Sequence, residues 1–80
     1  MNDDIRPYKE LACAIVERAI LDYREAAKDL KYAKQAPKRA LAMKTKIECM
    51  NFFKSDWFKI LVDIDPNYII EKLKEEERNL

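Results

Sequence analysis

The chain of 80 residues contains no glycine. Glycine adopts positive backbone φ angles without steric cost, and the tight turns of β-hairpins depend on it. Its absence argues against hairpin-rich β folds. It also excludes the glycine loops that hold phosphate groups in P-loop and dinucleotide-binding proteins. The chain must therefore be built from elements whose connections need no left-handed residue.

Apolar residues and prolines predict two long helices. Apolar residues recur at helical spacing from Leu11 to Ala33, and Pro7 suits a first helical turn, so we expect a helix over about residues 7–34. The residue before a proline is pushed out of the α region, so Pro37 ends this helix and begins a second one over about 37–54. The apolar residues expected on one face of the second helix are Ala40, Met43, Ile47, Met50 and Phe53.

Two short helices complete the prediction. Ser55 and Asp56 are favourable N-cap residues for a helix over about 56–63. Asp65 is the expected N-cap of a helix over about 66–77, with Pro66 at its first position. We expect an all-α single domain over residues 1–80, in which a long antiparallel helical hairpin is closed by the two short helices. No apolar run approaches the roughly 18 residues of a membrane span, and the acidic start does not resemble a signal peptide, so we expect a cytoplasmic protein without membrane partners.

The composition argues against an enzyme. The chain has no histidine, which removes the usual general base, serine- and cysteine-type triads and common zinc sites. Two cysteines alone cannot complete a tetrahedral zinc site. Cys13 and Cys49 are expected about 15 Å apart along the hairpin, too far for a disulfide, and both are expected to be buried thiols. Asp56 and Asp65 are explained by capping, and with Asp63 they provide no convincing metal site, so we expect no catalytic residue, metal or cofactor.

Positive charge is concentrated around the turn between the two long helices. Residues 28–46 hold seven basic residues and one acidic residue, a net charge of +6, although the whole chain carries only +1. The residues predicted to bind an anion are Lys31, Lys34, Lys38 and Arg39, with Tyr32 placed to stack on a base. The ligand could be a nucleotide, a nucleic-acid backbone or an acidic protein surface. The alternative is a solvated helix face on which lysine stems cover apolar side chains.

Aromatic residues are concentrated at the opposite end of the predicted hairpin. Phe52, Phe53, Trp57 and Phe58 fall around the corner between the second and third helices. One interpretation is a core cluster that closes the wide end of the hairpin. In the other, one pair is core while Phe53 and Trp57 form an exposed anchor for a second subunit.

Two stretches of the chain carry a family resemblance. AIVERAILDYREAAKDL, followed by the basic turn and then by FFKSDWF, DID and YIIEKL, is similar to short uncharacterised proteins encoded by prophages and integrative elements of Firmicutes. The resemblance implies a small intracellular accessory product of a mobile element, a class that includes inhibitors of host enzymes and oligomeric sponges for nucleotide signals. It assigns no activity to any residue.

Together these observations predict a non-enzymatic helical interaction module. We expect it to self-associate as a homo-oligomer and to bind a host protein or a small anionic, nucleotide-like ligand. The alternative is a nucleic-acid-binding accessory protein that uses the same basic turn.

Overall fold

The structure, a computed structural model, describes residues 6–80, with side chains from residue 9 onward. It contains four helices: α1 (Arg6–Tyr32), α2 (Ala36–Phe53), α3 (Asp56–Leu61) and α4 (Pro66–Arg78). No strand occurs within these described residues. The predicted all-α fold is confirmed, and every helix end lies within two residues of its predicted position.

Local chemistry explains where the short helices begin. The Ser55 hydroxyl accepts a hydrogen bond from the backbone N–H of Phe58 at 3.2 Å. The Asp65 carboxylate accepts one from the backbone N–H of Asn67 at 3.0 Å. Each bond satisfies a donor that has no partner within its own helix. The predicted caps Ser55 and Asp65 are therefore confirmed, whereas Asp56 is the first residue of α3 and does not cap it.

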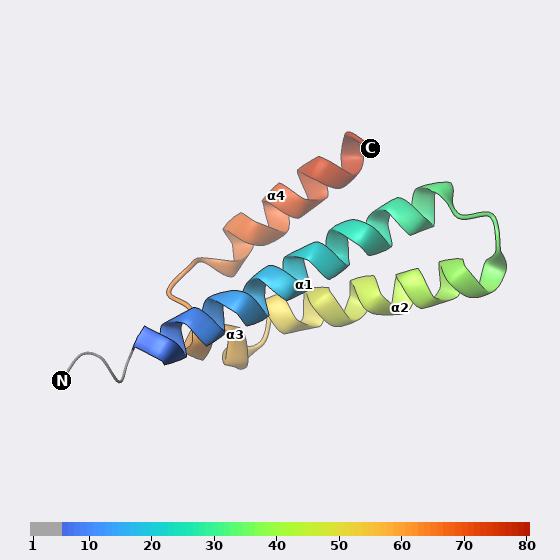
Figure 1. Cartoon of the computed structure of the whole chain (residues 1–80). Coiled ribbons are helices and arrows are strands. Elements are labelled where there is room, and N and C mark those ends of the chain that lie inside the picture. Colours follow the sequence, from blue (N-terminus) through green and yellow to red (C-terminus); the bar gives the residue numbers. More distant parts are fainter. Residues whose placement is uncertain (1–5) are drawn as a thin grey trace.

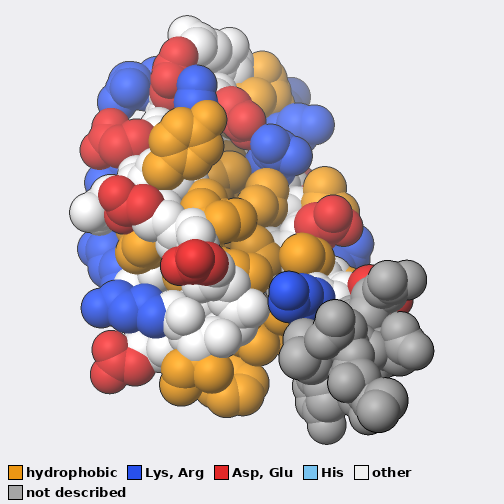
Figure 2. All heavy atoms as spheres, turned by 90° about the vertical axis from the view of Figure 1, so that its left-hand side faces the viewer, with side chains coloured by type: hydrophobic (Ala, Val, Ile, Leu, Met, Phe, Trp, Pro, Cys, Tyr) orange, Lys and Arg blue, Asp and Glu red, His pale blue; other side chains and the backbone are white. Residues whose placement is uncertain are grey.

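The helices form an elongated hairpin with a third helix laid along it. α1 and α2 are antiparallel and are connected by residues 33–35 (Figure 1). The end of the hairpin formed by this connection and the adjoining helix ends is here called the tip. α3 crosses the other extremity, here called the open end, where α1 begins and α2 ends. α4 starts there and runs back along the hairpin in the direction of the tip. The molecule measures 53 × 21 × 19 Å. Seen from the open end, apolar side chains reach the surface between charged ones (Figure 2).

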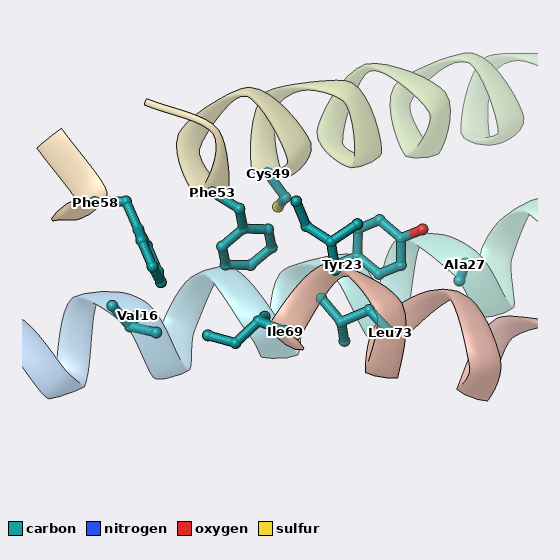
Figure 3. Packing of buried hydrophobic residues seen from close by; sticks show 9 residues of the cluster. Val16, Tyr23, Ala27, Cys49, Phe53, Phe58, Ile69 and Leu73 are labelled. Carbon is teal, nitrogen blue, oxygen red and sulfur yellow. The ribbon is translucent and has the colours of Figure 1, made fainter. Parts of the chain in front are cut away.

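The core lies between the hairpin and α4, toward the open end. Tyr23, Phe53 and Phe58 are fully buried, and their rings come from three different helices. Figure 3 shows Val16 of α1 and Ile69 and Leu73 of α4 converging on these rings. Phe52, Phe53 and Phe58 pack with ring centroids 5.7–5.9 Å apart, in tilted and edge-to-face arrangements. Such pairs add stability beyond the area that they bury.

This packing decides between the two interpretations of Phe53. Its side chain is 0% exposed, so the expectation that it forms an exposed subunit anchor is wrong. Phe53 ends α2, and its ring points from α2 toward Ile69 of α4, with Phe58 of α3 to one side (Figure 3). Trp57 is 55% exposed, and its predicted interface role stays a prediction.

The predicted apolar face of α2 is buried only in part, since Phe53 is buried and Met50 packs against the core, and the expected burial of Cys13 is wrong. Within α2 the buried residues are Ala42, Cys49 and Phe53, whereas Met43 and Ile47 are about half exposed. The apolar residues of α2 are distributed around all sides of the helix, so their spacing does not identify which side is buried. Cys49 is buried as expected, but Cys13 is exposed, because Ala12 and Val16 occupy the buried side of α1 in this stretch. Both thiols are free, which agrees with the expected absence of an intrachain disulfide.

Candidate functional site

The structure brings the five predicted anion-binding residues together at the tip. Lys31 and Tyr32 end α1, Lys34 lies in the connection, and Lys38 and Arg39 occupy the first turn of α2. All five side chains are exposed. All five residues therefore belong to the two helix ends and the connection at the tip, and their role in anion binding stays a prediction.

Contacts within the chain engage several of these side chains. The Arg39 guanidinium donates hydrogen bonds to the backbone carbonyl of Leu30 and, at 3.3 Å, to that of Ala33. These carbonyls are at the negative end of α1, so Arg39 acts as a C-terminal cap across the tip. Lys38 Nζ lies 3.9 Å from the Asp29 carboxylate. Arg39 and Lys38 thus join α1 to α2, in addition to any role toward a ligand.

Lys31 and Lys34 remain as the most available charges of the predicted site. The Lys31 ammonium lies over the Tyr32 ring at 5.7 Å from its centroid, in the range of a cation–π contact. Among residues 9–80, Lys34 forms no ion pair.

A second polar cluster, which sequence reasoning did not identify, fastens α4 to the hairpin. The buried Tyr23 hydroxyl of α1 donates a hydrogen bond to Glu77 Oε1 of α4 at 2.9 Å. Lys46 of α2 forms an ion pair with the same carboxylate and lies 5.7 Å from the centroid of the Tyr23 ring. One carboxylate is therefore shared by α1 and α2. The sequence showed Tyr23 only as a member of the apolar stripe, and nothing in it pointed to Glu77.

The ionisation of this cluster reflects its contacts. Partial burial alone would raise the pKa of Glu77, but hydrogen bonds from Lys46 and Tyr23 outweigh it and hold the pKa below its usual value. Burial, and then the Glu77 carboxylate, raise the pKa of Tyr23 well above that of an ordinary phenol. Arg24 donates two hydrogen bonds to Glu76, at 2.8 and 2.9 Å, and these lower the pKa of Glu76. The lowered pKa values of Glu76 and Glu77 favour the docked position of α4 at neutral pH, where both carboxylates are ionised.

The open end carries a concentration of large exposed apolar side chains. We call it the open-end surface and define it by five residues from α1, α3, α4 and the loop before α4: Leu11, Trp57, Ile60, Ile64 and Tyr68. Their exposed fractions run from 47% to 73%. Figure 2 views this end, with apolar side chains gathered across its centre and bordered by charged ones. These five residues belong to the elements that meet at the open end, and large exposed apolar side chains there make this end a candidate binding surface.

A groove runs between α1 and α2 on a side to which α4 contributes no lining residue. Near the tip it encloses about 370 Å³. We call it the hairpin groove; its lining residues there are Asp22, Glu25, Ala26, Asp29, Lys38, Leu41, Ala42 and Thr45. A shallower stretch of about 210 Å³ continues from Asp22 toward the open end, past Ile15 and Phe52. The groove was not foreseen, because its carboxylates are spread along a helix that reads as an ordinary charged face.

Other classes of site find no support in the part of the chain that the structure describes. No three carboxylate or thiol side chains in it gather closely enough to hold a metal ion. Asp65 caps α4, and Asp56 lies 4.0 Å from Lys59. None of the helices seen here combines the length and the apolar character needed to cross a membrane. No family model, curated protein or solved structure matches this chain.

Proposed function

We propose that the protein is a non-enzymatic helical interaction module that self-associates through its open-end surface. The observation that carries the proposal is the group of large exposed apolar side chains on α3 and on the elements beside it. Trp57 and Ile60 lie three residues apart in α3 and share its outer face, while Phe58 points into the core. Tryptophan is the residue type most enriched among the energetic centres of protein interfaces.

The size of this surface fits one half of a standard interface. At about 200 Å² for a fully exposed side chain of this kind, the exposed fractions leave roughly 600 Å² on these five residues. A standard interface buries about 800 Å² on each partner, and somewhat more than half of that area is apolar. The open-end surface therefore supplies the apolar centre of one such interface.

The shape of the subunit supports the same proposal. The chain exposes 6258 Å², whereas a compact monomer of 9.5 kDa exposes about 5,000 Å². A molecule only 21 × 19 Å in cross-section has a thin core and cannot enclose all its apolar residues. A single core in a chain of this size rarely supplies more than about 3–5 kcal/mol, and association is one of the ordinary ways to add to it.

The charges beside the surface are compatible with a second copy. Asp56 and Lys59 are both exposed and lie on α3 next to Trp57 and Ile60. In a two-fold arrangement with antiparallel α3 helices, Lys59 of one subunit approaches Asp56 of its partner, and the relation is reciprocal. This end of the molecule therefore attracts a copy of itself without an accumulation of like charge.

Sedimentation analysis of the full chain tests the proposal. At about 100 μM, a dimer with a micromolar Kd is almost fully formed, so the wild type should have twice the mass of 9.5 kDa. Ile60 is 73% exposed, so Ile60→Glu should leave the fold intact and yield monomers. Leu21→Glu is the matched control, because Leu21 is 47% exposed on α1 outside this surface. Leu21→Glu should remain dimeric; a monomeric wild type, or dimers that persist in Ile60→Glu, would refute the proposal.

The tip gives the module a second surface, of opposite character. We place an anionic partner there: a small nucleotide-like ligand or an acidic host protein, with a nucleic-acid backbone as the alternative. Lys31 and Lys34 are its first contacts, because Lys38 and Arg39 are also engaged with α1. Together with the resemblance to mobile-element proteins, this supports a cytoplasmic accessory factor that inhibits a host component or sequesters a signal.

A further inference from the structure

The hairpin groove has the shape of a binding site for one more helix. Its floor near the tip is made of Ala26 and Ala42, which face each other from α1 and α2 and are 3% and 4% exposed. Small residues allow a third backbone to approach the pair at the ordinary interhelical distance of about 8–10 Å. Beside this floor stands Leu41, 64% exposed, with no helix packed against it.

The groove is long enough to hold several helical turns. On α1 its lining runs from Ile15 to Asp29, which corresponds to about 21 Å of helix axis. Toward the open end, Ile15 and Phe52 add an apolar section that continues this binding site. α4 occupies the other side of the hairpin, where it contacts Tyr23 and Lys46, so the groove is left uncovered.

The charge along the groove selects the kind of helix that it accepts. Asp22, Glu25 and Asp29 line the α1 side at spacings of three and four residues. Asp29 is paired with Lys38 at 3.9 Å, and Asp22 lies 3.8 Å from Arg18. Glu25 forms no ion pair among the described residues, and Glu48 adds a further carboxylate toward the open end. The whole groove therefore carries four acidic and two basic side chains.

We propose that the hairpin groove binds a cationic amphipathic helix of a partner protein. The apolar stripe of that helix lies over Ala26 and Ala42 against Leu41, and its lysine or arginine side chains pair with Glu25 and Asp22. A nucleic acid or other polyanion is repelled here. If a second copy bound through the same groove, its carboxylates would face those of the first copy. The partner of the hairpin groove is therefore different from the second copy that binds the open-end surface.

A pair of synthetic peptides tests this inference. The first is an amphipathic helix of about 16 residues, roughly 24 Å long, with an alanine and leucine stripe flanked by lysine. The second replaces each lysine with glutamate. Binding is followed by backbone amide NMR on the Ile60→Glu variant as well as on the wild type, so the result does not depend on self-association. We expect the lysine peptide to shift the amides of Ala26, Ala42 and Thr45, and its affinity to fall as salt is added.

Charge-neutral variants of the protein complete the test. Asp22→Asn with Glu25→Gln should weaken binding of the lysine peptide by about tenfold or more, because both rim charges facing it are lost. Glu71→Gln with Glu75→Gln is the matched control, since both residues are exposed on α4 away from the groove. Equal binding of the two peptides, unchanged affinity in the groove variant, shifts confined to the open-end surface, or no shift at about millimolar peptide would each overturn the inference.

Discussion

Replacement of Tyr23 by Phe isolates the hydrogen bond that fastens α4 to the hairpin. The Tyr23 ring is 1% exposed and packs among the core residues, so Phe retains its shape and its apolar contacts. What disappears is the hydroxyl that donates to Glu77 Oε1 at 2.9 Å. Lys46 still pairs with the carboxylate, so the variant does not leave a buried charge alone.

The structure gives the expected magnitude. A hydrogen bond to a charged group contributes about 1.5–3 kcal/mol. The Glu77 side chain is 27% exposed and keeps Lys46 as a partner, which places the effect at the lower end, near 1.5 kcal/mol. In a domain of this size, each kcal/mol corresponds to about 4–8 °C in Tm, so the midpoint should fall by roughly 6–12 °C.

Urea unfolding followed by circular dichroism measures this change. A slope near 1 kcal/mol per molar urea places the midpoint of Tyr23→Phe about 1.5 M below that of the wild type. All samples need equal concentration, because association would itself stabilise the fold. Tyr32→Phe is the matched control: Tyr32 is 64% exposed at the tip and its hydroxyl makes no hydrogen bond within residues 9–80.

A double-mutant cycle decides whether the bond itself is responsible. Glu77→Gln alone should destabilise the fold, and addition of Tyr23→Phe to it should cost about 1 kcal/mol less than it does in the wild type. If Tyr23→Phe costs no more than Tyr32→Phe, or if the cycle shows no coupling, the assignment of α4 docking to this cluster is wrong.

Three further predictions concern charge. The pKa of Glu77 is lowered in the folded protein, so the ionised carboxylate stabilises the fold. This contribution to stability is complete above the unfolded pKa of about 4.3 and is lost as pH falls through the folded pKa. Glu77→Gln should therefore lose stability less steeply than the wild type on acid titration. The raised pKa of Tyr23 acts at the other limit, and stability should fall above about pH 10 in the wild type but less in Tyr23→Phe. At the tip, Lys31→Glu with Lys34→Glu should abolish salt-dependent binding of duplex DNA or a nucleotide in a gel-shift or calorimetric titration, and an equal charge reversal on the lysines of α4 should not; persistence of binding in the tip variant would exclude this site.

The helices were predictable because their ends are decided by local chemistry. Pro37 and Pro66 cannot continue a preceding helix, and Ser55 and Asp65 supply caps within three residues of their own position. These interactions depend only on neighbours in the sequence. They determine the number of helices and their ends without any knowledge of tertiary contacts.

The buried face of α2 was not predictable for the opposite reason. The apolar residues of α2 lie on all sides of the helix. Whether Ala42 and Cys49 or Met43 and Ile47 are buried therefore depends on how α1 and α4 approach it. The partners in the polar cluster are similarly non-local, since Tyr23 and Glu77 lie 54 positions apart. At the tip, composition located the basic cluster, but the carbonyls that engage Arg39 exist as acceptors only once α1 has ended at Tyr32.

α4 connects the open-end surface with the middle of the hairpin. It begins beside that surface, to which it contributes Tyr68, and it ends with Glu77 held by Tyr23 and Lys46. Ile69 and Leu73, between these two points, pack into the core, so α4 docks as one rigid piece. A second copy that covers Tyr68 therefore stabilises the docked position of the whole helix, and by thermodynamic reciprocity a weakened Glu77 contact weakens self-association. Tyr23→Phe should consequently raise the Kd of the proposed dimer although Tyr23 does not belong to the open-end surface, and an unchanged Kd would mean that the two ends of α4 act independently.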